Sequence, residues 1–372
     1  MQLKSKAMWS LATSLVAFTS VLSADMSDSQ MRNIENRVSA LEQRKGASGV
    51  INPNGRPQVR DGADLFLTAD LLLWQAHEGG LSLSVEQDIP NDATFFDDGE
   101  VKNLEWEWDW GFRVGLGYNL PHDGWDLYLN YTWLHSTAHK TTHVNGTSEI
   151  LSAVQGAPAS IGVGACDRSR AKWHANLNVL DLELGRQFFT SKWLTLRPHF
   201  GLRTAWIRQE FEVDYKNRDT NVTSIAKRTE NEVEQHNNFW GLGIRAGVDT
   251  QWGLGRGWSI YGNAAISLLY GFVHVRMSED KEAKEVTTED YEMVNSTRGD
   301  KAVTDLQLGL RWARMFDNDR WGLMLQAGWE HHMWFGQNQM LRFTDNTTQA
   351  AFVVNQGDLS YQGWTLNVRF DF

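Results

Sequence analysis

The sequence predicts an all-β protein: an antiparallel, up-and-down transmembrane β-barrel of ten to sixteen strands, with ten to twelve expected, preceded by a short helical or coiled-coil segment. Three observations predict this class. Apolar and polar residues alternate with a period of two over long stretches, tryptophans recur where those stretches begin, and the chain ends on an alternating aromatic strand. The 372 residues include 18 Trp and 32 Gly, yet the mean hydropathy is only -0.44.

The composition excludes several classes of protein. The single cysteine, Cys166, cannot build a disulfide scaffold or a cysteine-ligated zinc or iron–sulfur site. With 35 basic and 46 acidic side chains the formal net charge is -11, whereas nucleic-acid binding draws on an excess of Lys and Arg. No nucleic-acid partner is therefore expected.

The first 63 residues differ from the rest. Residues 1–24 are typical of an export signal, because Lys4 and Lys6 precede an uncharged stretch that ends in Ser23 and Ala24. A short membrane anchor is the alternative, although the stretch is short for a spanning helix. In residues 25–45, apolar side chains at 31, 34, 38 and 41 share one helical face, which favours a short amphipathic or coiled-coil helix, with a frayed helix as the alternative. Residues 46–63, which contain several Gly, Pro and Asn, are predicted to be a linker.

Residues 64–372 form the predicted barrel, with one wet and one apolar face on each strand. In residues 105–118, for instance, the even-numbered positions are all apolar and the odd-numbered positions are polar or glycine, so the two faces of the strand, or parities, differ. The charged residues of the polar parity are the predicted lining of a water-filled lumen: Glu105, Glu107, Asp109, Arg113, Asp126, Arg197, Arg203, Arg245, Asp249, Asp305, Arg311, Glu330 and Arg369. Acids slightly outnumber bases, which weakly favours passage of cations.

Turns and tryptophans set the expected topology. Trp125, Trp193, Trp258 and Trp321 each follow a short polar turn, as expected of an aromatic girdle at a membrane interface. Up-and-down counting gives ten strands, at 64–75, 104–119, 124–135, 173–188, 193–211, 237–252, 257–275, 302–315, 320–333 and 359–372. Long polar connections separate them on the other side, near 75–103, 135–172, 212–236, 275–301 and 334–358. Additional strand pairs within the long connections, around 81–87 and 340–354, would raise the number of strands to between twelve and sixteen.

The carboxyl terminus gives an independent signal. Trp364, Leu366, Val368, Phe370 and Phe372 alternate with polar residues to the last position. This pattern is similar to the closing strand of bacterial outer-membrane barrels, which the barrel assembly machinery recognises. A soluble edge strand is the alternative.

Four segments resemble a known family. Residues 66–76 (FLTADLLLWQA), 110–118 (WGFRVGLGY), 122–128 (HDGWDLY) and 178–186 (NVLDLELGR) are similar to the major outer membrane proteins of Legionella and environmental, Chlamydia-like bacteria. The resemblance covers essentially the whole barrel and implies an abundant, trimeric, porin-like protein with a surface role in host contact. It does not extend to a cross-linked, cysteine-rich coat, because Cys166 stands alone.

Other motifs have ordinary explanations. His135, His139 and His143 have metal-ligand spacing, and His331 and His332 form a second cluster, but both lie where predicted strands run into loops. Solvated loop histidines are therefore expected, and no metal or cofactor. No catalytic constellation can be assembled, so no enzymatic activity is expected. A lectin or glycanase with exposed Trp, and an outer-membrane lipase, are the alternatives.

The function expected from these features is that of an outer-membrane porin, which lets ions and small polar solutes diffuse through a charged lumen. The alternative is a plugged structural barrel or adhesin whose long outer loops contact host cells. The expected partners are outer-membrane lipid and lipopolysaccharide, the barrel assembly machinery, and further copies of the chain in a homo-oligomer.

Overall fold

The computed structural model describes residues 52–88, 99–121, 123–144, 148–152, 154, 166–216, 228–283, 286–343 and 352–372. The predicted export signal and the predicted helix at 25–45 lie outside these residues. Within the described part of the chain, no helix is long and apolar enough to cross a membrane.

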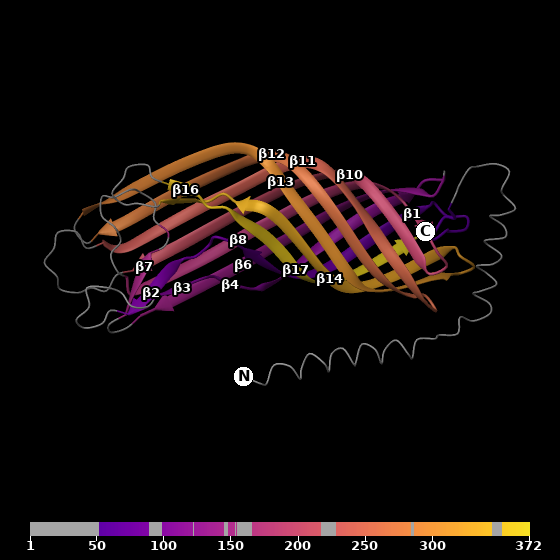
Figure 1. Cartoon of the computed structure of the whole chain (residues 1–372), viewed down its shortest axis with the longest axis horizontal. Helices are drawn as coiled ribbons and strands as arrows, with labels where there is room; N and C mark the ends of the chain where they lie inside the picture. Colours follow the sequence, from indigo (N-terminus) through magenta and orange to yellow (C-terminus); the bar gives the residue numbers. More distant parts are fainter. Residues whose placement is uncertain are drawn as a thin grey trace, which may run out of the picture.

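Ten long strands close into one antiparallel barrel (Figure 1). They are β1 (Leu65–Glu78), β5 (Trp108–Asn119), β6 (Trp125–His143), β8 (Arg168–Arg186), β10 (Leu194–Lys216), β11 (Arg228–Gly255), β12 (Trp258–Ala283), β13 (Val286–Phe316), β14 (Trp321–Asn338) and β17 (Gly357–Asp371). Each pairs with its neighbours in this order, and β17 returns to β1 with Phe66 opposite Asp371. The predicted barrel and its strand count of ten are confirmed.

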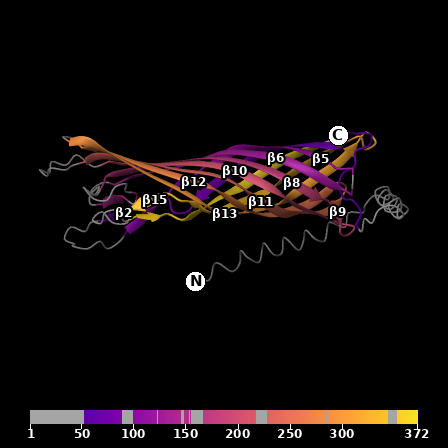
Figure 2. The same cartoon turned by 90° about the horizontal axis from the view of Figure 1, so that it is seen from above.

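Most of the barrel strands run further from the short turns than the alternation predicts. The stretches 135–172, 212–236, 275–301 and 334–358 were expected to be loops. However, β6 continues to His143, β10 to Lys216, β12 to Ala283 and β14 to Asn338, and β8 starts at Arg168, β11 at Arg228 and β13 at Val286. Polar strands can continue their ladder in water, so pairing does not stop where apolar residues stop. Figures 1 and 2 show β12 and β13 projecting at the end far from the C-terminus. We call this the loop end and the opposite one the turn end.

The strands suspected inside the long loops exist, but they do not enter the barrel. β2 (Ser84–Asp88) pairs with β3 (Gly99–Lys102) and β7 (Ser148–Ser152) in a separate sheet. β15 (Leu341–Phe343) and β16 (Phe352–Val354) form a second small sheet. Two further pieces lie beside the barrel strands: β4 (Glu105–Trp106) on β6 and β9 (Phe188–Phe189) on β10.

The outer surface of the barrel is apolar and exposed. Ile244, Ile266 and Leu308 are each at least 64% exposed, although such side chains are normally buried. On the closing strand, Trp364, Leu366, Val368 and Phe370 are 40–54% exposed. The last residue, Phe372, exchanges backbone hydrogen bonds with Leu65 and completes the closure. A continuous apolar outer face of this kind suits contact with lipid tails.

The turn end holds the four predicted girdle tryptophans. Trp125, Trp258 and Trp321 begin β6, β12 and β14, and Trp193 directly precedes β10. Trp321 stacks on Phe316 with ring centroids 4.3 Å apart. Their position at one end of the barrel fits the expected girdle, whose contact with a membrane interface stays a prediction.

The described part of the predicted linker crosses the turn end. The Arg56 guanidinium donates to the carbonyl of Trp125 (2.8 Å), the Gly55 amide donates to the carbonyl of Gln187, and the Arg60 amide to that of Asp319. Residues 52–64 therefore connect turns that belong to three different strand pairs.

Candidate functional site

Inward-facing side chains divide the barrel interior into two zones. Towards the loop end they form an apolar layer, in which each residue is at most 2% exposed; it comprises Leu72, Trp74, Leu134, Trp173, Ile207, Phe239, Leu269, Val303, Trp334 and Tyr361. These residues come from every barrel strand except β5, which contributes Gly111 opposite Leu72 and Leu134. The interior is thus filled at this level, as expected when few strands close a barrel.

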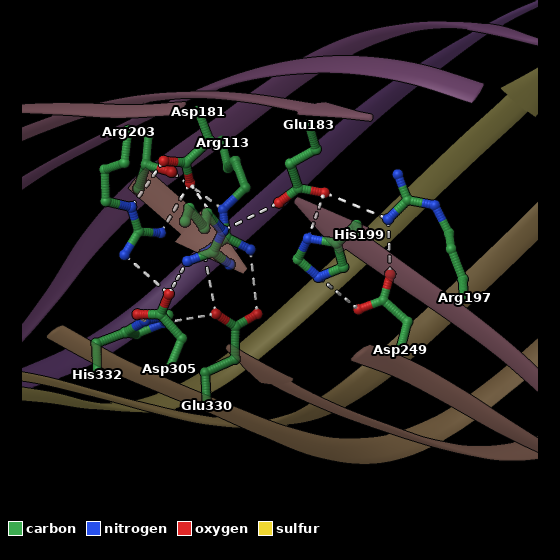
Figure 3. A network of polar contacts seen from close by, with 12 residues as sticks. Arg113, Asp181, Glu183, Arg197, His199, Arg203, Asp249, Asp305, Glu330 and His332 are labelled. Atoms are coloured by element: carbon green, nitrogen blue, oxygen red, sulfur yellow. Dashed lines mark hydrogen bonds and ion pairs between the residues drawn. The ribbon is translucent and has the colours of Figure 1, made fainter. Parts of the chain in front are cut away.

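On the turn-end side of the apolar layer, charged residues occupy the interior, and Figure 3 shows their contacts. On one side Arg113, from β5, donates to Asp70 of β1 (Nη1 to Oδ2, 3.0 Å) and to Glu330 of β14 (Nη2 to Oε2, 2.9 Å). The imidazole of His332 bridges Glu330 and Asp305, at 2.8 and 2.7 Å. Strands far apart in the sequence are joined across the interior by these contacts.

Asp305 of β13 connects this group to the arginines of β10 and β11. Arg203 holds Asp181 in a bidentate pair (2.7 and 2.8 Å), and its Nη1 lies 2.8 Å from Asp305 Oδ2. Arg245 also pairs with Asp305 and donates to Glu183 (Nε to Oε1, 3.1 Å). Bidentate guanidinium–carboxylate pairs fix both partners in position.

Arg197 of β10 forms the far side of the network. It donates to Asp126 (Nη2 to Oδ1, 2.6 Å), to Asp249 (Nη1 to Oδ2, 2.9 Å) and to Glu183 (Nη1 to Oε2, 3.3 Å). His199 lies between Glu183 and Asp249, at 3.6 and 3.7 Å. Figure 3 shows the chain of contacts running from His332 to Arg197.

The network compensates each of its buried guanidinium groups. Arg113, Arg197, Arg203 and Arg245 each lie within 3.3 Å of at least two carboxylates. Charges taken out of water are costly unless they are paired and hydrogen-bonded in this way. Unlike the free arginines and acids of an open lumen, these side chains hold one another.

The two zones are in contact. The Trp74 ring lies 4.6 Å from the His332 ring and 5.6 Å from the Arg113 guanidinium, and the Trp334 ring lies 6.0 Å from the Arg203 guanidinium. A cavity of about 210 Å³ remains, and its lining runs from Trp74 and Trp334 to Gln187 and Gln251 near the turns. Arg311 and Arg369 also line it.

Most of the predicted lumen residues point into the barrel. Ten of them line the cavity or join the network: Arg113, Asp126, Arg197, Arg203, Arg245, Asp249, Asp305, Arg311, Glu330 and Arg369. Asp109 lies nearer the loop end, where it accepts from the Thr137 amide (2.9 Å).

Glu105 and Glu107 do not reach the interior network. Pairing slips by one residue between β4 and β5, so that Glu105 lies opposite His139 whereas Gly111 lies opposite Leu134. Both carboxylates are exposed; Glu105 pairs with Lys140 and Glu107 with His139. The same slip turns Trp106 inward, where its ring contacts Trp173 at 5.0 Å. An irregularity of one residue exchanges the two faces of a strand.

Five network residues were not among the predicted lumen residues: Asp70, Asp181, Glu183, His199 and His332. The expectation that His332 is a solvated loop histidine is wrong, because it lies inside the barrel between two carboxylates. The available signal was its parity, since His332 shares the inward face of β14 with Glu330. His135, by contrast, contacts Asn176 (2.8 Å), and His139 is exposed beside Glu107.

The described residues contain one group of carboxylates spaced for a metal ion: Glu212, Asp214 and Glu232, on β10 and β11 near the loop end. The Lys172 ammonium already pairs with Glu212 at 2.6 Å. Asp214 lies directly opposite Glu232 in the ladder, so proximity follows from strand pairing alone.

The closed antiparallel barrel with its apolar outer face defines an integral β-barrel protein of the bacterial outer membrane. The model of the family described as "Legionella pneumophila major outer membrane protein precursor" matches residues 57–372. The chain belongs to this family, as the four sequence segments predicted. None of the curated proteins is similar enough in sequence to count as a match.

Several solved barrels are similar in outline. The outer membrane protease OmpT from Escherichia coli is 7% identical, with a TM-score of 0.39 over 83% of this chain and 96% of its own. A major outer membrane protein from Thermus thermophilus is 10% identical, with a TM-score of 0.29 over 83% and 98%. The TodX monoaromatic hydrocarbon channel, as a deletion mutant, is 8% identical, with a TM-score of 0.27 over 88% and 94%. Structural similarities this weak do not indicate the function of this chain.

Proposed function

We propose that this protein is a closed outer-membrane barrel with a structural role at the cell surface, and that it is not a permanently open diffusion pore. One observation supports the proposal above all: the apolar layer of inward side chains, each at most 2% exposed. A side chain that lined an open aqueous channel would keep much of its surface in contact with water.

The strand count supports the same conclusion. Barrels of about eight strands have an interior that side chains can fill, whereas porins with roughly 16–18 strands leave an aqueous channel. Ten strands put this barrel near the filled end of that range. The charged network adds a second obstacle, because ions would have to displace partners held at 2.6–3.3 Å.

Passive diffusion of ions and small polar solutes is the second candidate. The cavity of about 210 Å³, lined by arginines and carboxylates near the turn end, favours it. This route would require the apolar layer to open, since Trp74 and Trp334 lie between the cavity and the loop end.

The surface role belongs to the loop end, where four strands and two small sheets extend the barrel. We propose that this rim makes the contacts with the surroundings, and that the apolar outer face meets lipid, lipopolysaccharide or further copies of the chain. Recognition of the closing strand by the barrel assembly machinery is part of the same proposal. That the chain is not an enzyme stays a prediction.

Swelling of proteoliposomes tests the closed barrel. Refolded protein is incorporated into liposomes, which are diluted into isotonic arabinose, a small neutral solute. We expect swelling no faster than for protein-free liposomes of the same lipid, with heat-modifiable gel migration as proof of folding. Rapid swelling with folded protein would reject the closed barrel and favour diffusion.

A further inference from the structure

The interior arginines differ in how far their charge is compensated. The four arginines of the network each contact at least two carboxylates, but Arg311 of β13 contacts none among the residues that the structure describes. Its Nη1 donates to the amide oxygen of Gln251 (2.7 Å). The side-chain amide of Gln326 lies against its Nε and Nη2, and with the amide oxygen turned towards them it accepts from both.

Neutral amide oxygens satisfy the N–H groups of Arg311 without cancelling its charge. The guanidinium also lies over the ring of Tyr261, with 5.6 Å between the guanidinium carbon and the ring centroid. A ring face stabilises a cation only partly. A partly buried cation without a counter-charge is disfavoured, so an anion beside Arg311 would stabilise it.

A second guanidinium lies across β14 from the first. Arg311 is opposite Gln326 of β14, and Arg369 of β17 is opposite Met324 of the same strand. Among the described residues, Arg369 has one carboxylate partner, Asp371 (Nη2 to Oδ1, 2.6 Å), and its guanidinium lies over the ring of Phe66 at 3.6 Å.

The carboxylate best placed to compete is already engaged. Asp249, two residues before Gln251, accepts from Arg197 at 2.9 Å and lies 3.7 Å from His199. It forms no ion pair with Arg311 in this structure. The positive charge near the turn end is therefore open to a ligand from the cavity, which both Arg311 and Arg369 line.

We propose that the turn-end half of the interior is a binding site for a small oxyanion, such as phosphate, held by Arg311 and Arg369, with the amide groups of Gln251 and Gln326 beside them. Planar guanidinium groups match the geometry of oxyanions. The cavity of about 210 Å³ is large enough for such an ion with its water. The proposal does not depend on whether the barrel conducts.

Isothermal titration calorimetry with inorganic phosphate tests the site, using full-length protein refolded in micelles of a phosphate-free, uncharged detergent. We expect saturable binding to the wild type. Arg311→Gln should weaken it by at least about tenfold, the effect of losing one charge-assisted contact, whereas Arg311→Lys should retain part of it. Arg320→Gln is the matched control, because Arg320 is an exposed turn arginine whose side chain is 66% exposed, and should leave binding unchanged.

Absence of saturable binding by folded wild type would overturn the proposal, and so would equal affinity in Arg311→Gln. Binding of glucose as strongly as phosphate would also overturn it, because the site is inferred from charge. Heat-modifiable migration of each variant separates loss of the site from loss of the fold. Since binding is measured without a membrane potential or a solute gradient, its failure would leave the closed-barrel proposal untouched.

Discussion

Individual charged side chains in the interior depend on one another. Arg203 is 4% exposed, and it holds Asp181 at 2.7 Å and lies 2.8 Å from Asp305. Removing a single partner from such a group leaves uncompensated buried charges, which typically costs more than the intact pair contributes. Each charged residue of the network is therefore held in place by its partners.

We expect Arg203→Met to lower the free energy of unfolding by about 3–5 kcal/mol, because the buried Asp181 loses its bidentate partner and Asp305 loses one of its contacts. Urea unfolding followed by tryptophan fluorescence in micelles measures the change. Arg320→Met is the control: its side chain is 66% exposed and 3.6 Å from Asp317, so its effect should stay within about 0.5 kcal/mol. Equal effects of the two substitutions would show that the network is not what stabilises the interior.

Sequence alone could assign charged residues to a face but not to partners. The alternation predicted that the side chains of Arg113, Arg203 and Asp305 point inward, because each is a charged residue flanked by positions of the mainly apolar outward face. It did not identify Asp181 and Glu183, because the inward face of β8 is apolar in one part of the strand and charged in another. Its inward residues Leu177 and Val179 belong to the apolar core, whereas Asp181 and Glu183 belong to the network, so the strand shows no single polar parity.

At the scale of elements, the strands keep pairing beyond the apolar band. The ten strands and their turn-end limits could be predicted, because apolar alternation and polar turns mark them. Their loop-end limits could not be predicted, because a polar strand in water and a polar loop have similar compositions. The slip between β4 and β5 was also invisible, since a one-residue irregularity leaves the alternation of each piece intact.

The loop end of the β10–β11 pair carries opposed acids. Asp214 lies opposite Glu232, and Glu212 lies opposite Glu234; like charges in these positions destabilise a sheet. Partial burial, together with the nearby carboxylates of Asp214 and Glu212, raises the pKa of Glu232. The stability that this group contributes below its unfolded pKa is lost as the pH rises through its folded pKa.

At neutral pH, Glu232→Gln should therefore slow amide hydrogen exchange at the loop ends of β10 and β11. The expected factor is roughly two or less, because solvent screens an exposed carboxylate. As the pH falls through the raised pKa of Glu232, the difference from wild type should disappear, because the Glu232 carboxyl becomes neutral as well. Glu292→Gln is the control: Glu292 pairs with Arg276 at 3.1 Å, so losing its charge should not slow exchange. Slower exchange in Glu232→Gln both at neutral pH and below the pKa of Glu232 would contradict the electrostatic explanation.

For the whole molecule, the decisive feature is the order of zones along the barrel axis. The turn-end half contains charged groups and a cavity, and the loop-end half contains an apolar layer beneath an extended rim. The alternation predicts an apolar outer face and a polar inner face. It cannot predict whether ten strands leave a channel, because that depends on how the inward side chains of all strands fill the interior together.

Single-channel recording in planar lipid bilayers tests the closed barrel most directly. Folded wild-type protein should insert without discrete conductance steps. A variant with Trp74, Trp173 and Trp334 replaced by alanine, still heat-modifiable on gels, should conduct, because three large side chains of the apolar layer are gone. Discrete, ohmic steps of the same size from wild type and variant would mean that the layer does not close the barrel.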